Sequence, residues 1–328
     1  MNTIRRTLVV APYIGEFGWE LMNWQGRVRW LTARGGFERL VVCARTDRRP
    51  LYGEVPGRVP VVFCPVPAFE MPGEANEDHR IWPDGRPVDS KLLRELVLEQ
   101  IRSACEQGGV DLTDADLMVP GFRGRTWSTE RSEQVFDTLR FSLTLTTDVL
   151  LVPRSRHSAT ERNRPLSWWE DLAARLTGGG LRVELYRAPL EESIRQLSRS
   201  RLAAGASTGG LHLASLCRCP HYVWGSDGNA RWTRWGMTNR QRYETVWNPL
   251  GTPCRYDECG WQPDAAYAAD QIRRTLDEIG LTDSNAAGSW ALRPAWRVKR
   301  GLARVLHPAD GASPWPWRLR QLVRERLV

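Results

Sequence analysis

The chain contains no long hydrophobic run. Its apolar segments are short, as in residues 8–11, 40–44 and 149–153, whereas a membrane-spanning helix needs about 20 apolar residues. The sequence therefore predicts no transmembrane helix. The apolar run before Pro12 is also too short for the core of a secretory signal, so we expect the protein in the cytoplasm.

Cysteine is sparse as well, with seven residues in 328. An odd number at this low density favours reduced thiols over a disulfide framework. One group could in principle hold zinc, but its C-x-C and C-x₄-C spacings differ from the C-x₂-C pairs of zinc ribbons. The spacing therefore argues against a zinc site at this group: Cys217, Cys219, Cys254 and Cys259.

The composition is otherwise that of an ordinary globular protein, with 41% hydrophobic and 26% charged residues. It excludes wholesale disorder and collagen-like repeats. A chain of 328 residues is long enough for two domains. The net charge of +8 favours an anionic partner, such as a nucleotide phosphate, a lipid head group or a nucleic acid.

Short apolar runs alternate with amphipathic stretches, which is typical of parallel sheets covered by helices. One series begins with a strand over 7–12, and a second begins with a strand over 149–152. We expect an α/β protein with two Rossmann-like domains, over residues 1–145 and 146–283, followed by a basic, tryptophan-rich helical segment over 284–328. The further strands are expected at 40–43, 59–63, 117–120, 181–186, 202–204 and 221–224, and the helices after residue 21 and at 90–105, 166–176, 190–200, 211–216 and 264–280.

A glycine-bounded turn follows the first strand. Glu16 lies between Gly15 and Gly18, at the carboxyl edge of the expected sheet, where ligands of open α/β folds bind. Two interpretations stay open: Glu16 is a general base, or it is a helix-start acid that complements the helix dipole.

A second glycine-bearing loop precedes the helix at 211–216. Residues 205–210 offer hydroxyl groups and backbone N–H groups at a helix N-terminus, which bind anions, and the chain has no GxxxxGK[ST] signature. A phosphate-binding loop and a simple tight turn remain alternatives. The candidate phosphate-binding residues are Ser207, Thr208, Gly209, Gly210 and His212.

Arginines and aromatic residues near these loops give weaker signals. Arg154 and Arg156 follow the strand at 149–152 and could bind diphosphate oxygens, or could be solvated, because 44 of the 46 basic residues are arginine. Trp224, Asp227 and Asn229 could wall a nucleotide or sugar pocket, although tryptophans more often pack in a core.

Two segments together resemble a known family. PYIGEFGWELMNWQ at 12–25 and GASTGGLHLASLCRCPHYVWG at 205–225 are similar to the signatures of GT-B glycosyltransferases of the heptosyltransferase type. The resemblance implies two Rossmann-like domains facing across a cleft, with Glu16 as the base that activates the acceptor. It also implies that the loop from Ser207 to His212 binds the donor's diphosphate. Aspartate is usual at the position of Glu16, and Arg154 stands where lysine is usual.

The resemblance implies transfer of a sugar from a nucleotide-diphosphate donor to a cell-surface glycan or glycolipid acceptor. It implies no metal and no cofactor beyond the donor substrate, and Asp114-Ala115-Asp116 is interpreted as a helix-to-strand loop. Gly15, Gly18, Trp224, Asp227 and Asn229 are the expected substrate-binding residues. The alternatives are a nucleotide-sugar epimerase on the same fold and, less favoured, a nucleic-acid-binding protein that uses its Arg/Trp-rich segments.

The C-terminal segment interleaves arginine with tryptophan, leucine and valine over 293–328. Such a segment fits peripheral binding to an anionic inner-membrane surface, which would suit a lipid-linked acceptor. It fits packing against the N-terminal domain equally well, and both interpretations stay open.

Overall fold

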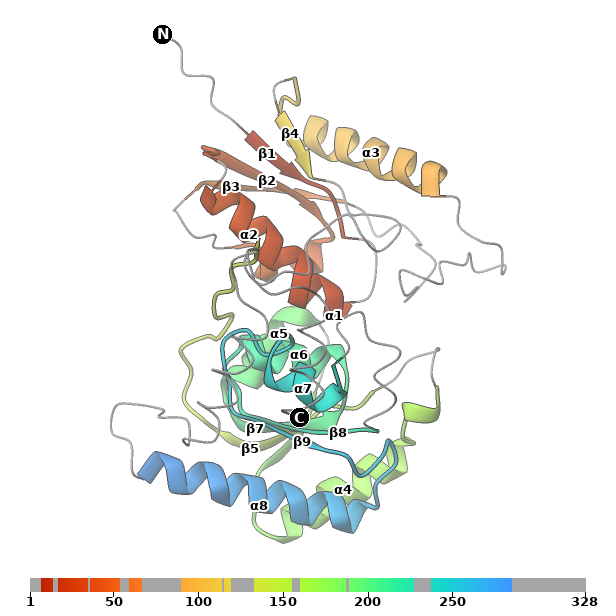
Figure 1. Cartoon of the computed structure of the whole chain (residues 1–328), viewed down its shortest axis with the longest axis vertical. Helices are drawn as coiled ribbons and strands as arrows, with labels where there is room; N and C mark the ends of the chain where they lie inside the picture. Colours follow the sequence, from red (N-terminus) through yellow and green to blue (C-terminus); the bar gives the residue numbers. More distant parts are fainter. Residues whose placement is uncertain are drawn as a thin grey trace, which may run out of the picture.

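The computed structural model describes residues 7–13, 17–34, 36–53, 59–66, 90–113, 115–118, 133–154, 160–186, 189–226 and 237–284. These residues form two separate parallel β-sheets, each with helices on both faces (Figure 1). The expected α/β fold with two Rossmann-like units is therefore confirmed. No helix among the described residues is long and apolar enough to cross a membrane.

The first sheet has the strand order β3-β2-β1-β4. Its strands are parallel, and β1 pairs with β2 on one side and with β4 on the other. A continuous helical segment follows β1 on one face, and α3 covers the other face (Figure 1). The strands are β1 (Thr7–Val10), β2 (Arg39–Ala44), β3 (Val61–Pro65) and β4 (Ala115–Met118), and the helices are α1 (Phe17–Trp19), the π-helical turn η1 (Glu20–Trp24), α2 (Gln25–Arg34), the 3-10 helix η2 (Thr46–Leu51) and α3 (Ser90–Gln107).

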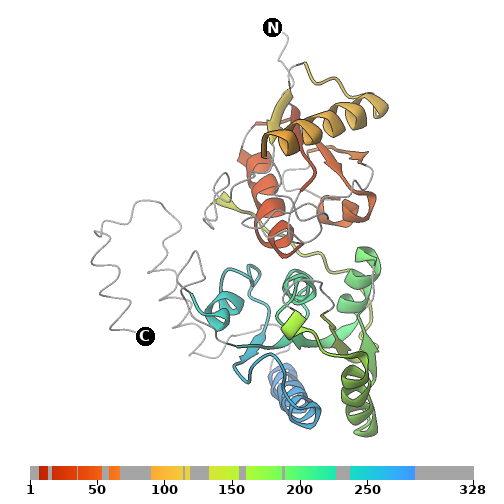
Figure 2. The same cartoon turned by 90° about the vertical axis from the view of Figure 1, so that its right-hand side faces the viewer.

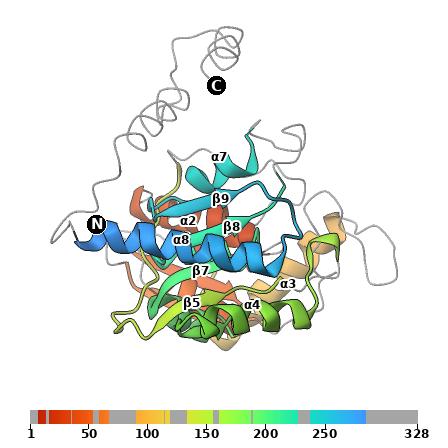
Figure 3. The ribbon, with the colours of Figure 1, turned by 90° about the horizontal axis from the view of Figure 1, so that it is seen from below.

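The second sheet has the strand order β6-β5-β7-β8-β9, and all its pairings are parallel. Helices α5, α6 and α7 lie on the face toward the first unit (Figure 2). Helices α4 and α8 lie side by side on the opposite face (Figure 3). The strands are β5 (Thr147–Leu151), β6 (Val183–Leu185), β7 (Ser200–Ala206), β8 (His221–Trp224) and β9 (Cys254–Asp257), and the helices are η4 (Thr160–Arg162), α4 (Leu166–Gly178), α5 (Leu190–Ser198), α6 (Gly209–Leu216), α7 (Asn239–Glu244) and α8 (Ala265–Ser284).

Alternate strand residues face two different cores, as the two-residue period of a strand requires. Leu8 and Val10 of β1 belong to one core and Val9 to another, which α3 covers. The core that holds Leu8 also contains Leu150 of β5 and Leu211 of α6. Because one apolar cluster includes residues of both units, the face of the first sheet that carries α1 and α2 packs toward the face of the second sheet that carries α5 and α6.

The segment that joins the two sheets hydrogen-bonds to both units. Val135 donates its N–H to the carbonyl of Gly26 in α2 at 2.9 Å, and Leu139 donates to the carbonyl of Leu216 in α6 at 3.0 Å. A Cβ atom at Gly26 would lie 2.6 Å from the ring of Phe136, so only glycine permits this approach. The connection therefore helps to hold α2 and α6 at a set distance.

All the expected strands and helices that fall on described residues are present, with ends shifted by a few residues. The short elements η2, η4, α7 and β9 and the π-helical turn η1 were not predicted, because three to six residues give too little periodicity to detect. The interpretation of residues 114–116 as a loop is wrong for Asp116, which lies within β4 and pairs with Leu8. The domain boundaries remain predictions, and the segment 285–328 lies outside the described residues.

Asp148 on β5 generates a prediction about acid stability. Hydrogen bonds from Arg182, at 2.9 to 3.2 Å, and from Arg201, at 3.3 Å, lower the pKa of this carboxyl to about 2. A lowered folded-state pKa stabilises the fold above the unfolded value of about 3.9, and that stabilisation is lost as the pH falls toward 2. We expect Asp148→Asn to cost about 1–2 kcal/mol at pH 7, and urea denaturation should show the difference from wild type shrinking below pH 4.

A matched control is Asp171→Asn, which removes an exposed pair with Arg175 one helical turn away. It should cost no more than about 0.5 kcal/mol at any pH. An Asp148→Asn penalty that stays constant between pH 7 and pH 3 would contradict the role given to this carboxylate.

Candidate functional site

The order of strands in the second sheet defines a switch point between β5 and β7. The chain places β6 on one side of β5 and β7 on the other, so the connections that leave the carboxyl ends of β5 and β7 diverge. Ligands of open α/β sheets bind outside this point. Here it is flanked by Val152 and Arg154 after β5 and by the loop from Ser207 to Gly210 after β7.

Two glycines lie close to Val152, which directly follows β5. Gly205 is near the end of β7, and Gly210 is in the first turn of α6. A Cβ atom at Gly205 would lie 2.6 Å from the carbonyl oxygen of Val152, and one at Gly210 would lie 2.6 Å from Val152 Cγ1. Real Cβ atoms do not make such contacts, so a side chain at Gly205 would force β7 away from Val152, and one at Gly210 would force α6 away from it. These glycines set the position of the N-terminus of α6.

The N-terminus of α6 begins with groups suited to an anion. Thr208 is the N-cap residue, and its side chain makes no capping hydrogen bond. The first N–H groups of a helix have no carbonyl acceptor within the helix and carry partial positive charge, which here applies to Gly209 and Gly210. Ser207 accepts a hydrogen bond from the Tyr243 hydroxyl at 2.9 Å, which holds the loop against α7.

His212 lies on the first turn of α6 in an aromatic setting. Its ring stacks on Tyr243 at a centroid distance of 5.3 Å and meets the edge of Trp247 at 4.7 Å. Only 7% of the residue is exposed. On the remaining side lies Gly18, where a Cβ atom would sit 3.0 Å from His212 Cδ2. His212 therefore lies directly against the first helix of the other unit.

The two glycine-bearing turns singled out in the sequence meet in space. The Cβ position at Gly209 is 3.0 Å from Phe17 Cδ1 and 3.7 Å from the Gly18 nitrogen. Helices α1 and α6 are thus in contact through Phe17 and Gly18 on one side and Gly209 on the other. Gly15 and Glu16, the two residues that precede Phe17, lie outside the described residues, so the base expected at Glu16 stays a prediction.

Arg48 and Glu20 stabilise the same junction, and sequence reasoning missed both. Arg48 Nε pairs with Glu20 Oε2 at 3.0 Å, and Tyr52 donates to Glu20 Oε1 at 3.0 Å. The Arg48 guanidinium also lies over the ring of Phe17, 4.7 Å from its centroid. Burial raises the pKa of Glu20, while Arg48 and Tyr52 oppose this shift. The ion pair joins η2 to η1, and the Arg48 guanidinium also contacts the ring of Phe17 in α1.

The other expected site residues fall into two groups. Arg154 is 4% exposed and donates to Asn163 Oδ1, so it lies at the edge of the sheet as expected but is largely covered. Trp224 is fully buried and packs against Trp168 and Trp169, with centroids 5.8 Å away. This makes Trp224 a core residue, with no exposed surface for a substrate. Arg156, Asp227 and Asn229 lie outside the described residues.

No protein-family model and no curated protein sequence matches the chain. Solved structures similar to it include the Escherichia coli heptosyltransferase WaaC with ADP, at 12% identity and a TM-score of 0.42, covering 82% of this chain and 99% of that one. The E. coli ADP-heptose LPS heptosyltransferase II has 10% identity and a TM-score of 0.46, covering 83% and 99%. The glycosyltransferase of kitacinnamycin has 13% identity and a TM-score of 0.36, covering 98% of both chains.

Two of these solved structures are heptosyltransferases, and the third is another glycosyltransferase. The two sequence segments resemble the same class of protein.

A glycine substitution tests the close packing at α6. Gly210→Ala should cost about 1–3 kcal/mol, because the new methyl group would overlap Val152 Cγ1. Gly178→Ala is the matched control, since nothing lies within 4 Å of its Cβ position at the end of α4. Urea denaturation of both variants measures the difference. Equal stability of the two variants would contradict the packing.

A second pair of variants tests the buried ion pair. Arg48→Met leaves the Glu20 carboxylate buried without its cation and should cost about 3 kcal/mol. The double variant Arg48→Met/Glu20→Gln removes the charge and should recover part of that loss. Arg175→Met, which removes an exposed pair with Asp171 on α4, should cost less than about 0.5 kcal/mol. Purely additive effects of the two substitutions would show that the pair is not coupled.

Proposed function

We propose that the chain is a glycosyltransferase that moves a sugar from a nucleotide-diphosphate donor to a glycan or lipid-linked acceptor. The observation that carries the proposal is the contact of Phe17 and Gly18 with Gly209 and His212. It joins α1, which follows β1, to the N-terminus of α6, a loop suited to phosphate, and Glu16 precedes Phe17 directly in the sequence.

The donor is assigned to the second unit. The diphosphate oxygens would accept hydrogen bonds from the N–H groups of Gly209 and Gly210 and from the hydroxyl groups of Ser207 and Thr208. The positive end of the α6 dipole would stabilise the charge that builds up on the diphosphate as it leaves. Arg154 at the end of β5 adds positive charge at the same edge of the sheet.

The acceptor is assigned to the first unit, with Glu16 as the general base. Its carboxylate would take the proton of the acceptor hydroxyl as that oxygen bonds to the sugar carbon and the bond from this carbon to the diphosphate breaks. The other acid in this segment, Glu20, is engaged by Arg48 and Tyr52. Glu20 is therefore a structural residue, which supports Glu16 as the residue of this segment that acts on substrate.

Binding and turnover should separate in one variant. Glu16→Gln should retain the rise in melting temperature produced by a nucleoside diphosphate, and should lower transfer by about 10²–10⁴-fold, the usual contribution of a general base. The measurements are a thermal-shift panel of nucleoside diphosphates and release of the diphosphate from matching nucleotide sugars with glycan and glycolipid acceptors. Glu99→Gln, on an exposed position of α3, is the control and should change neither.

Two results would contradict the proposal. One is the absence of any thermal shift with the whole panel of nucleoside diphosphates and nucleotide sugars. The other is tight binding of nucleic acid, with an affinity that falls steeply as salt rises, together with no response to nucleotide sugars. Conversion of a nucleotide sugar without transfer to an acceptor would favour the epimerase alternative instead.

A further inference from the structure

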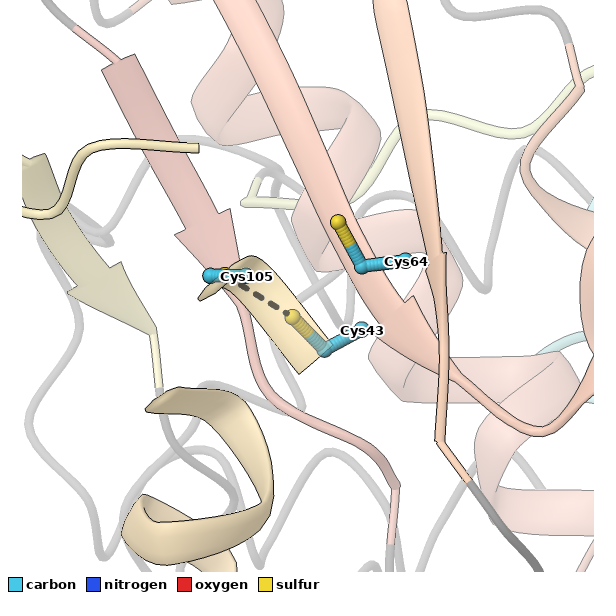
Figure 4. A group of neighbouring side chains, drawn as sticks. All are labelled: Cys43, Cys64 and Cys105. Atoms are coloured by element: carbon cyan, nitrogen blue, oxygen red, sulfur yellow. Dashed lines mark hydrogen bonds between the residues drawn. The ribbon is translucent and has the colours of Figure 1, made fainter. Parts of the chain in front are cut away.

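Three buried cysteines from separate elements converge in the first unit, away from the candidate active site. Cys43 lies on β2, Cys64 on β3 and Cys105 near the end of α3 (Figure 4). Cys43 and Cys64 are register partners on adjacent strands, so their side chains leave the same face of the sheet. Helix α3 covers that face and brings Cys105 to them. All three residues are at most 1% exposed.

The spacing of the sulfur atoms fits a shared metal ion. All three Sγ atoms lie within 4.8 Å of one another, and Cys43 Sγ is 3.6 Å from Cys105 Sγ. An ion bonded to three thiolates in a plane at about 2.3 Å separates the sulfurs by about 4.0 Å. The observed arrangement therefore reaches this geometry through small rotations of the side chains, without movement of the strands.

The surroundings determine which kind of ion fits. The cysteines lie in an apolar core with Val9, Val41 and Ile101, and no fourth histidine, cysteine or carboxylate among the described residues joins the group. Zinc in structural sites takes four ligands, whereas soft thiolate sites also select Cu(I). A buried, apolar site with three sulfurs favours the ion that accepts three ligands. Arg39, which acts electrostatically on Cys64, partly offsets the negative charge of the thiolates.

We propose that Cys43, Cys64 and Cys105 form a three-thiolate site for a soft metal ion, with Cu(I) the best match. On binding, each thiol bonds to the ion through its sulfur and releases its proton to solvent, so no oxidant or reductant takes part. The other buried cysteines do not form such a group among the described residues. The site is independent of the proposed transferase reaction, because it lies on the face of the first sheet that α3 covers.

The experiment is a titration of the full-length, reduced protein with Cu(I) under anaerobic conditions against a competing Cu(I) chelator. We expect one Cu(I) per chain by native mass spectrometry, with a thiolate-to-copper absorption band in the ultraviolet. Cys105→Ala should weaken Cu(I) binding by more than about 100-fold. This exceeds the loss in metal affinity of about 10- to 100-fold that follows when a residue supporting a metal ligand is removed. Cys217→Ala, at an equally buried cysteine of α6's C-terminal end, is the matched control and should bind like wild type.

Urea denaturation of the metal-free variants shows whether each one folds, and Cys64→Ala replaces Cys105→Ala if the latter does not. Two results would overturn the proposal: no binding in competition with the chelator, or equal binding by the Cys105 and Cys217 variants. Uptake of Zn(II) in preference to Cu(I), lost in Cys105→Ala, would support the three-thiolate site and overturn the assignment of Cu(I).

Discussion

Close approach of glycine residues to neighbouring elements determines how this molecule is packed. Gly210 lets the start of α6 lie against Val152 at the end of β5, and Gly205 lets β7 lie against the same residue. Gly209 lets α6 lie against the ring of Phe17. A methyl group at these positions would require shifts of backbone or core atoms. Gly210 therefore sets the distance between α6 and the end of β5, and Gly209 sets the distance between α6 and α1 of the first unit.

The surrounding interactions maintain this arrangement. The core that contains Leu8 and Leu211 spans both units, and the connection at Val135 and Leu139 hydrogen-bonds to α2 and to α6. The pair formed by Arg48 and Glu20 lies under Phe17. Burial of apolar surface supplies most of the stabilisation, whereas the ion pair and the hydrogen bonds fix the orientation of the elements that they join. Together they keep the N-terminus of α6 against Phe17 and Gly18 of α1, and the transfer proposed above would need such a fixed arrangement of two substrates.

The first unit has two faces with different chemistry. One face of its sheet lies under α1 and α2 and takes part in the junction with the second unit, while the other lies under α3 and contains the three cysteines. Alternation of side chains along β2 separates them, with Val42 on one side and Cys43 on the other. A ligand bound at the cysteines would therefore act on the stability of the first sheet without touching the junction.

Local sequence patterns are enough to predict the alternation of strands and helices, the two-sheet organisation and the place of both glycine-bearing turns after a strand. Those features follow from local periodicity and from glycine and proline positions. Tertiary structure decided which distant residues meet: Phe17 with Gly209, Arg48 with Glu20, and Cys43 with Cys64 and Cys105. It also placed Trp224 in the core. Such contacts depend on how helix and sheet faces pack, and a linear pattern contains no distance between residues far apart in the chain.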